Sequence, residues 1–211
     1  MNNTPSAASA PAAPQESKPL EKQPVLKPAV SLLWNHVGGL LACIVVCIGA
    51  GFAGLLQGTG LWFSLIALLF LYSLPIYNNM WTLGHSDKNL ADFGHIKLNP
   101  LRGVTIGLLA NAPNLLLGLL FFLSKFGIGW NITVLYKFLN PEVWPLINLI
   151  QPEISMLDFT VWQALLVALL PLIPVVIAEI SYYLGTKDLS VGHKLVYKDP
   201  AQKPKQNVPK P

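Results

Sequence analysis

Seven polar side chains lie inside long apolar stretches of this sequence, and they are the residues best suited to chemistry. A carboxylate, an imidazole or an amide in apolar surroundings can bind an ion, and the first two can exchange a proton. A charge at the centre of a membrane helix costs about 2.5 to 3.5 kcal/mol, so such residues often mark function. The seven residues are Asn35, His36, Asn78, Asn79, Asn111, Asn114 and Glu179.

These polar residues have two interpretations, and the sequence leaves both open. The first is a hydrated vestibule that opens to the cytoplasm, in which His36 exchanges protons. Its lining would consist of Asn78, Asn111, Asn114 and Glu179. The second is a set of hydrogen bonds that hold neighbouring helices together. Both interpretations place the polar residues in the half of the membrane that faces the cytoplasm.

Four further residues are of types that bind metal ions: His85, Asp87, Asp92 and His95. Their spacing is a weak indication, since only Asp92 and His95 lie three apart and could share a helical face. Basic neighbours at positions 88, 97 and 102 would oppose a bound cation. We therefore predict no metal and no cofactor, and we interpret residues 81–103 as a solvated loop attracted to anionic lipid.

Motifs of known catalytic sites are absent from the sequence. It contains no HExxH, no GxSxG and no glycine-rich nucleotide-binding loop. Each of these motifs places a specific nucleophile, base or phosphate cradle, so their absence removes the common routes to catalysis. We predict that the protein is not an enzyme.

Long charge-free stretches must position these side chains. Residues 28–86 and 103–124 contain no Asp, Glu, Lys or Arg, and residues 159–186 contain only Glu179. A helix of roughly twenty apolar residues crosses the hydrocarbon core of a membrane. The pattern predicts an all-α fold with four transmembrane helices, at about 30–56, 61–80, 103–124 and 160–184. The composition, 53% hydrophobic and 11% charged, excludes an ordinary soluble domain.

The segment between the third and fourth predicted spans is apolar but interrupted. Prolines at 141, 145 and 152 and charges at 137, 142 and 153 make it unsuited to crossing the membrane. Trp130 and Trp144 flank a short run with helical spacing, which is typical of a helix that lies in the membrane interface. One or two short interfacial helices are expected here, and a buried loop packed on the bundle is the alternative.

Four prolines fall inside the predicted spans: Pro75, Pro113, Pro171 and Pro174. Each removes a backbone donor and clashes with the carbonyl four residues earlier, so three of the four helices are expected to kink. The freed carbonyl oxygens need new partners inside the membrane. Asparagine side chains or trapped water would supply them.

Both ends of the chain are polar. Residues 1–28 are rich in Pro, Ala and Lys and residues 187–211 in Lys, so we expect disordered tails on either side of a membrane domain at 29–186. Short segments rich in Lys and Arg stay on the cytoplasmic side of a membrane. Four spans place twelve of the 14 basic residues on one face, which predicts cytoplasmic termini in the cell membrane. Because this pattern already explains the net charge of +4, we expect no nucleic-acid partner.

Two functional classes remain open, and the sequence favours the first only slightly. The first is a transporter component or transport-accessory subunit that uses the inner polar residues. Four helices rarely enclose a complete pathway, so such a protein would work as a homo-oligomer or beside a partner membrane protein. The second is a non-catalytic membrane scaffold whose basic tails bind membrane lipid or protein partners.

Overall fold

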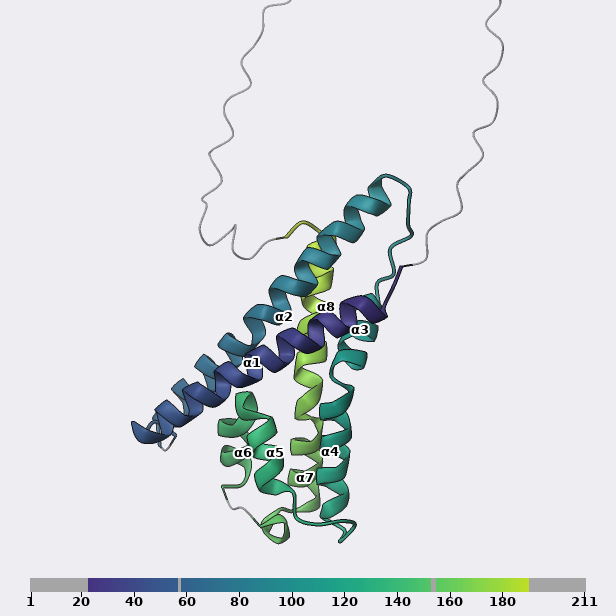
Figure 1. Cartoon of the computed structure of the whole chain (residues 1–211). Helices are drawn as coiled ribbons and strands as arrows, with labels where there is room; N and C mark the ends of the chain where they lie inside the picture. The colour runs from purple at the N-terminus through teal and green to yellow at the C-terminus, as the bar shows by residue number, and fades with distance from the viewer. Residues whose placement is uncertain (1–22, 57, 153–154, 190–211) are drawn as a thin grey trace, which may run out of the picture.

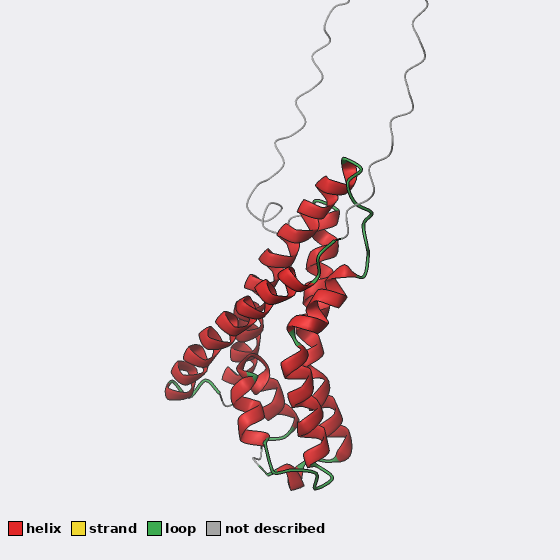
Figure 2. Cartoon of the chain, turned by 45° about the vertical axis from the view of Figure 1, so that its right-hand side comes forward, coloured by secondary structure: helices red, strands yellow, loops and turns green. Residues whose placement is uncertain are grey.

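The computed structural model describes residues 23–56, 58–152 and 155–189, and these residues form helices and no strand (Figure 2). The all-α class is therefore confirmed. The elements are α1 (Leu26–Phe52), α2 (Gly60–Asp92), α3 (Arg102–Ala110), α4 (Ala112–Ser124), α5 (Thr133–Leu139), η1 (Pro141–Val143), α6 (Trp144–Ile150), η2 (Met156–Asp158), α7 (Val161–Leu169), η3 (Leu170–Leu172) and α8 (Ile173–Thr186).

Among the described residues, three helical stretches are long and apolar enough to cross a membrane. They are α1, α2 and residues 161–186, where α7, η3 and α8 follow one another. The pair α3 and α4 also passes this test, but its two halves meet at a bend of 64°. The part of the chain that the structure describes thus contains three to four candidate spans, a pattern typical of a multi-pass membrane protein.

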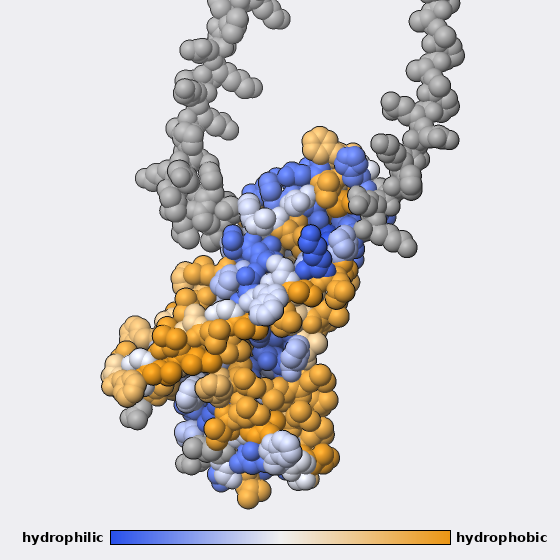
Figure 3. All heavy atoms as spheres, in the orientation of Figure 1, coloured by the Kyte–Doolittle hydropathy of each residue, from blue (hydrophilic) through white to orange (hydrophobic). Residues whose placement is uncertain are grey.

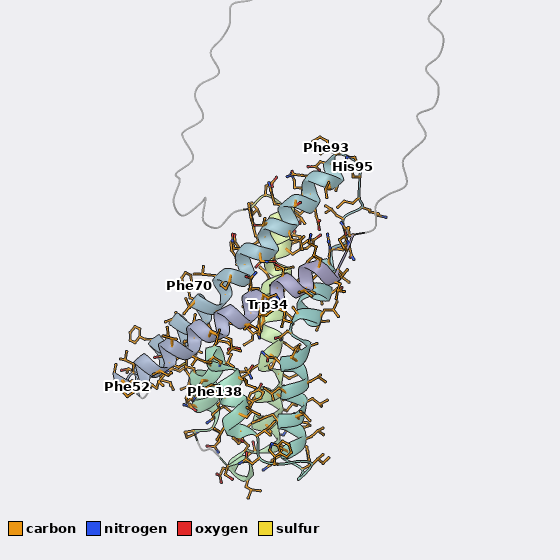
Figure 4. The ribbon with its side chains drawn as sticks, in the orientation of Figure 1. Trp34, Phe52, Phe70, Phe93, His95 and Phe138 are labelled. Atoms are coloured by element: carbon orange, nitrogen blue, oxygen red, sulfur yellow. The ribbon has the colours of Figure 1, made fainter. Side chains whose placement is uncertain are left out.

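The surface of these helices is apolar over most of its area. Large aromatic side chains such as Trp34, Phe52 and Phe70 project outward from α1 and α2 (Figure 4). The largest group of polar residues lies at the end of the molecule where α2 finishes, and smaller polar patches lie at its middle and lower end (Figure 3). Apolar groups face outward at low cost only where the surrounding solvent is itself apolar, so this surface suits contact with lipid.

Helix α2 is longer than the sequence predicts. The prediction of a loop over residues 81–103 is wrong, because α2 continues to Asp92 and only residues 93–101 connect it to α3. The reason is tertiary packing, since this end of α2 lies along α8. A Cβ atom on Gly84 would overlap the carbonyl oxygen of Tyr182, and one on Gly185 would overlap that of Trp81. The two helix backbones are therefore in direct contact.

The helices diverge from one end of the molecule (Figures 1 and 2). There α2 and α3 both pack against α8. From this end the α1–α2 hairpin runs to one side, while α4 and α7, packed against each other, run to the other. The segment α5–η1–α6 lies between the hairpin and the α4–α7 pair (Figure 1).

Two apolar cores result from this arrangement. The first core draws on α1, α2, α3 and α8, and it includes Leu68, Tyr72, Ile106 and Ala178. The second draws on α4 to α7, and it includes Phe121, Tyr136, Ile147 and Val167. The interrupted segment 126–157 therefore contains two short helices, α5 and α6, whose inner faces pack on the rest of the molecule.

Breaks in the helices lie next to prolines. The third predicted span is divided at Asn111, with Pro113 in the first turn of α4. The fourth passes through η3, which contains Pro171, and Pro174 lies in the first turn of α8. Proline fits a first turn because its missing N–H has no partner to lose there. Helix α2, by contrast, runs through Pro75 without a break.

Side chains from neighbouring helices satisfy two backbone oxygens at these breaks. The hydroxyl of Tyr136 donates to the carbonyl oxygen of Val167 at 2.7 Å. The side-chain amide of Asn111 donates to the carbonyl oxygen of Pro171. A backbone oxygen without a partner is costly in an apolar medium, so these contacts stabilise the broken helices where they are interrupted.

Candidate functional site

Three helices bring together a buried set of hydrogen-bonded side chains, His36, Tyr72 and Asn114, which we call the His36 cluster. The Nδ1 atom of His36 is hydrogen-bonded to the Tyr72 hydroxyl, and its Nε2 atom lies 2.8 Å from the Asn114 amide nitrogen. His36 is 6% exposed and Tyr72 is 1% exposed. Because these residues come from α1, α2 and α4, the cluster joins three candidate spans.

A glycine makes room for this cluster. A Cβ atom on Gly39 would lie 3.2 Å from the ring of Tyr72, so a larger residue would push the ring away from His36. The backbone positions agree with this contact, because His36 and Gly39 lie three apart and share the buried face of α1. The two rings meet edge to face, with centroids 5.3 Å apart.

Hydrogen bonding determines which ring nitrogen of His36 carries the hydrogen. A neutral imidazole donates from one ring nitrogen and accepts at the other. With the Asn114 amide donating to Nε2, the ring hydrogen lies on Nδ1 and the Tyr72 oxygen accepts it. If the Asn114 amide turns over, Tyr72 donates to Nδ1 instead and Nε2 donates to the amide oxygen. A single amide rotation thus reverses the direction of donation along the cluster.

Asn111 lies beside this cluster, at the break between α3 and α4. Its amide oxygen is buried and has no hydrogen-bond partner among the described residues. A small cavity of about 10 Å³ adjoins it, lined by Leu32, His36, Ile76, Gly107, Ala110, Asn111 and Pro174. That volume holds about one water molecule, and the polar side chains of Asn111 and His36 would bind it.

Glu142 is a buried carboxyl in η1, between the two cores. Its side chain is 3% exposed, and its Oε2 atom has no hydrogen-bond partner among the described residues. The carboxyl lies close enough to four other ionisable side chains to interact with them electrostatically: Cys43, Cys47, Tyr72 and Tyr136. Burial raises the pKa of Glu142 to about 7, because the charged form loses its hydration.

Glu142 and Tyr72 are the residues of this site that the sequence reasoning missed. The interrupted composition of residues 126–157 predicts a segment at the membrane surface, where a carboxyl is unremarkable. A contact across the chain places η1 inside, since the Cys47 sulfur donates to the carbonyl oxygen of Pro141. The available signal was the presence of Glu142 and Lys137 in an apolar, proline-rich stretch.

The raised pKa of Glu142 predicts a specific dependence of stability on pH. Between pH 4.5 and about 7 the folded protein binds a proton at Glu142 that the unfolded chain has released. Stability is therefore fully present below this window and falls as the pH rises through it. The substitution Glu142→Gln removes this loss, so its advantage in thermal unfolding midpoint over the wild type should grow from pH 5 to pH 8. A constant difference between the two proteins would contradict the prediction.

Glu179 has a structural partner of its own. Its Oε2 atom accepts a hydrogen bond from the backbone N–H of Val104 at 2.8 Å, in the first turn of α3. The N–H groups of a first turn have no partner within their helix, and the helix dipole favours a negative charge there. Gly103 allows this approach, since a Cβ atom in its place would lie 2.5 Å from the carboxylate. Glu179 thus secures α3 to α8.

The remaining predicted polar residues lie apart from the His36 cluster. Asn79 donates to the hydroxyl of Ser31 at 3.0 Å, which joins α1 to α2. Asn78 is exposed on α2, and Asn35 is half-buried on α1. The seven residues therefore do not line one common space. His36 and Asn114 meet directly, Asn111 adjoins the same small cavity, and Glu179 binds elsewhere.

The four metal-binding residue types of the predicted loop are dispersed. Asp87 forms a buried ion pair with Arg102, His85 pairs with Asp188 at 2.5 Å, and His95 is exposed beyond the end of α2 (Figure 4). Asp92 pairs with Lys88 at 3.2 Å. Within residues 23–56, 58–152 and 155–189, no three His, Cys, Asp or Glu side chains are placed to hold a metal ion.

A larger hollow lies at the far end of the α1–α2 hairpin. Its volume is about 500 Å³, and it is lined by Gly51, Gly54, Leu56, Leu61, Trp144, Asn148 and Pro152. Asn148 also accepts a hydrogen bond from the Lys137 ammonium at 2.9 Å. The hollow begins close to η1, because Gly51 lies one helical turn beyond Cys47 and Trp144 lies two residues beyond Glu142.

The basic tails on which the scaffold hypothesis depends lie almost entirely outside the described residues. Comparison with protein-family models, with curated proteins and with solved structures finds no match to this chain. The arguments about function therefore depend on the geometry of the chain itself.

Proposed function

We propose that this protein is a small multi-pass membrane transport component that moves a small ion between the two faces of the membrane. The observation that supports it best is the buried Glu142, whose Oε2 atom has no hydrogen-bond partner in the part of the chain that the structure describes, and which lies near Tyr72 of the His36 cluster. A purely structural network is expected to satisfy its buried polar groups. A carboxyl held among apolar helices without a counter-charge is instead typical of an ion pathway.

The proposal includes a topology. We take α3 and α4 as one bent span, which gives four spans and places both termini on the same face. The asymmetry in basic residues supports a cytoplasmic location for that face, in the cell membrane. The α5–η1–α6 segment then extends inward from the opposite, outer face, with the hollow at Trp144 and Asn148 open to that side.

The size of the interior space favours an ion over an organic solute. The cavity beside the His36 cluster is about 10 Å³, which holds about one water molecule. A pathway of this width suits a species that moves along hydrogen-bonding groups. Four spans leave little room for a wider pathway within one copy, so a larger solute would need a second copy or a partner membrane protein.

Reconstitution tests this function directly. The purified full-length protein is placed in liposomes that contain fluorescent reporters for H⁺, Na⁺, K⁺ or Cl⁻, and an ion gradient is applied. We expect at least one ion to cross faster than in protein-free liposomes. His36→Gln, which breaks the cluster, should slow that flux by about tenfold, a barrier increase of about 1.4 kcal/mol.

Asn78→Ala is the matched control, since it removes an exposed amide from the same part of the molecule and should leave the flux unchanged. If no ion crosses faster than in protein-free liposomes, the transport proposal fails. An equal loss in both variants would contradict a role for the His36 cluster.

A further inference from the structure

We propose, on the basis of the transport function above, that the transported ion is the proton and that Glu142 is the group that binds it between the two faces. Glu142 meets three geometric requirements of such a group. It is buried, it has an oxygen free to take a proton, and it lies between a hollow on one side and a hydrogen-bonded cluster on the other.

Access from the outer side is short. The sulfur of Cys47 contacts the carbonyl oxygen of Pro141, the residue before Glu142, at 3.6 Å. Gly51, one helical turn of about 5.4 Å further along α1, lines the 500 Å³ hollow. On the other side of η1, Trp144 lines the same hollow. The backbone next to Glu142 thus contacts α1 about one turn of helix from a space large enough for several water molecules.

The elements around η1 leave the carboxyl without a counter-charge. Helix α1 presents two thiols, those of Cys43 and Cys47, and α2 presents the Tyr72 hydroxyl. Helix α5 presents the Tyr136 hydroxyl, and α6 has no ionisable residue in its sequence. Each of these groups is neutral at physiological pH.

The lysine of the neighbouring helix α5 directs its ammonium group to other residues. Lys137 of α5 directs its ammonium group to Asn148 Oδ1 at 2.9 Å and to the carbonyl oxygen of Pro152 at 3.3 Å. A carboxylate paired with a lysine would remain charged, whereas an unpaired buried carboxyl exchanges its proton in the neutral range. The pKa of Glu142, raised by burial to about 7, agrees with this geometry.

Tyr72 provides the inward route. It lies within electrostatic range of Glu142, and its hydroxyl is hydrogen-bonded to His36 Nδ1. No hydrogen bond joins Glu142 to Tyr72 among the described residues, so the transfer step requires the carboxyl to turn toward Tyr72 or a water molecule to bridge them. The carboxyl then gives its proton toward the Tyr72 oxygen as the Tyr72 hydroxyl gives its own proton to Nδ1. Glu142 becomes a carboxylate, His36 becomes an imidazolium, and Tyr72 is neutral before and after. For Nδ1 to accept the proton from Tyr72, Asn114 must already present its amide oxygen to the Nε2 hydrogen, which is the amide rotation described above.

Two measurements on the full-length protein in liposomes test this proposal. The first is infrared difference spectroscopy between acid and alkaline buffer, which detects the C=O stretch of a protonated carboxyl. We expect a carboxyl band that titrates near neutral pH in the wild type and in Glu179→Gln, and that is lost in Glu142→Gln. The second is proton flux under a K⁺ diffusion potential, which Glu142→Gln should lower by about tenfold or more.

Glu179→Gln is the matched control, because it also neutralises a carboxyl that the sequence places in a span but keeps an oxygen to accept the Val104 hydrogen bond. The proposal is overturned if the titrating band persists in Glu142→Gln or if proton flux is unchanged in that variant. Flux of Na⁺, K⁺ or Cl⁻ without H⁺ would also overturn it while the transport function stands. If no ion crosses at all, both proposals fail together.

Discussion

Replacing Asp87 with asparagine is expected to destabilise the protein more than any other single change of charge. Asp87 and Arg102 are 4% and 3% exposed and form an ion pair between the C-terminal part of α2 and the start of α3. Tyr182 of α8 donates to the same carboxylate at 2.8 Å. Asp87→Asn leaves the Arg102 guanidinium buried without a counter-charge, which costs about 3 to 5 kcal/mol.

The measurement is the thermal unfolding midpoint of the purified protein in detergent, together with its yield from membranes. Asp92→Asn is the control, because it removes a carboxylate five residues along the same helix from an exposed pair with Lys88. Exposed ion pairs contribute little, so this control should unfold almost as the wild type does. Equal midpoints for Asp87→Asn and Asp92→Asn would show that the buried pair does not hold these helices together.

Replacing Gly185 with valine is expected to separate α2 from α8 near the C-terminal ends of both helices. A Cβ atom at this position overlaps the carbonyl oxygen of Trp81 and lies 2.9 Å from the backbone nitrogen of His85. These are backbone atoms of a continuous helix, so neither can move aside without displacing α2. Overpacking costs about 1 to 3 kcal/mol even where side chains can adjust, and here the displacement also pulls Tyr182 away from Asp87.

Gly49→Val is the control for this substitution. A Cβ atom on Gly49 has no other atom within 4 Å, so valine at that position of α1 meets no obstacle. We expect a lower unfolding midpoint for Gly185→Val and an unchanged one for Gly49→Val. Crosslinking between cysteines introduced on α2 and α8 should also fall in Gly185→Val alone. A wild-type midpoint in Gly185→Val would disprove the backbone contact.

The spans could be predicted from the sequence because a charged side chain is costly in lipid, so segments that cross a membrane contain few charged residues. The 64° bend at Asn111 was foreseeable only as a kink near Pro113, since its size depends on how α4 packs against α7. The helical continuation from Trp81 to Asp92 was missed because polar residues there resemble a loop. This part of α2 is helical because it packs against α8 at Gly185, which lies more than ninety residues further along the chain.

The candidate site was only partly accessible from the sequence. His36 and Asn114 stand out as polar residues in apolar stretches, and they do meet. Glu179 stands out for the same reason, but it binds the start of α3 instead. Glu142 does not stand out, because its burial arises from the packing of η1 against α1 and α2, which are distant in the sequence. The composition of a segment does not reveal such long-range packing.

The two apolar cores have a mechanical consequence. Only two routes lead along the helices from one core to the other, α3 to α4 and α8 to α7, and both are interrupted at the same level, at Asn111 and at η3. The Asn111 side chain bridges these interruptions by binding Pro171. If the molecule bends, we expect the bend at an axis through these two breaks, with α4 and α7 moving together relative to the α1–α2 hairpin.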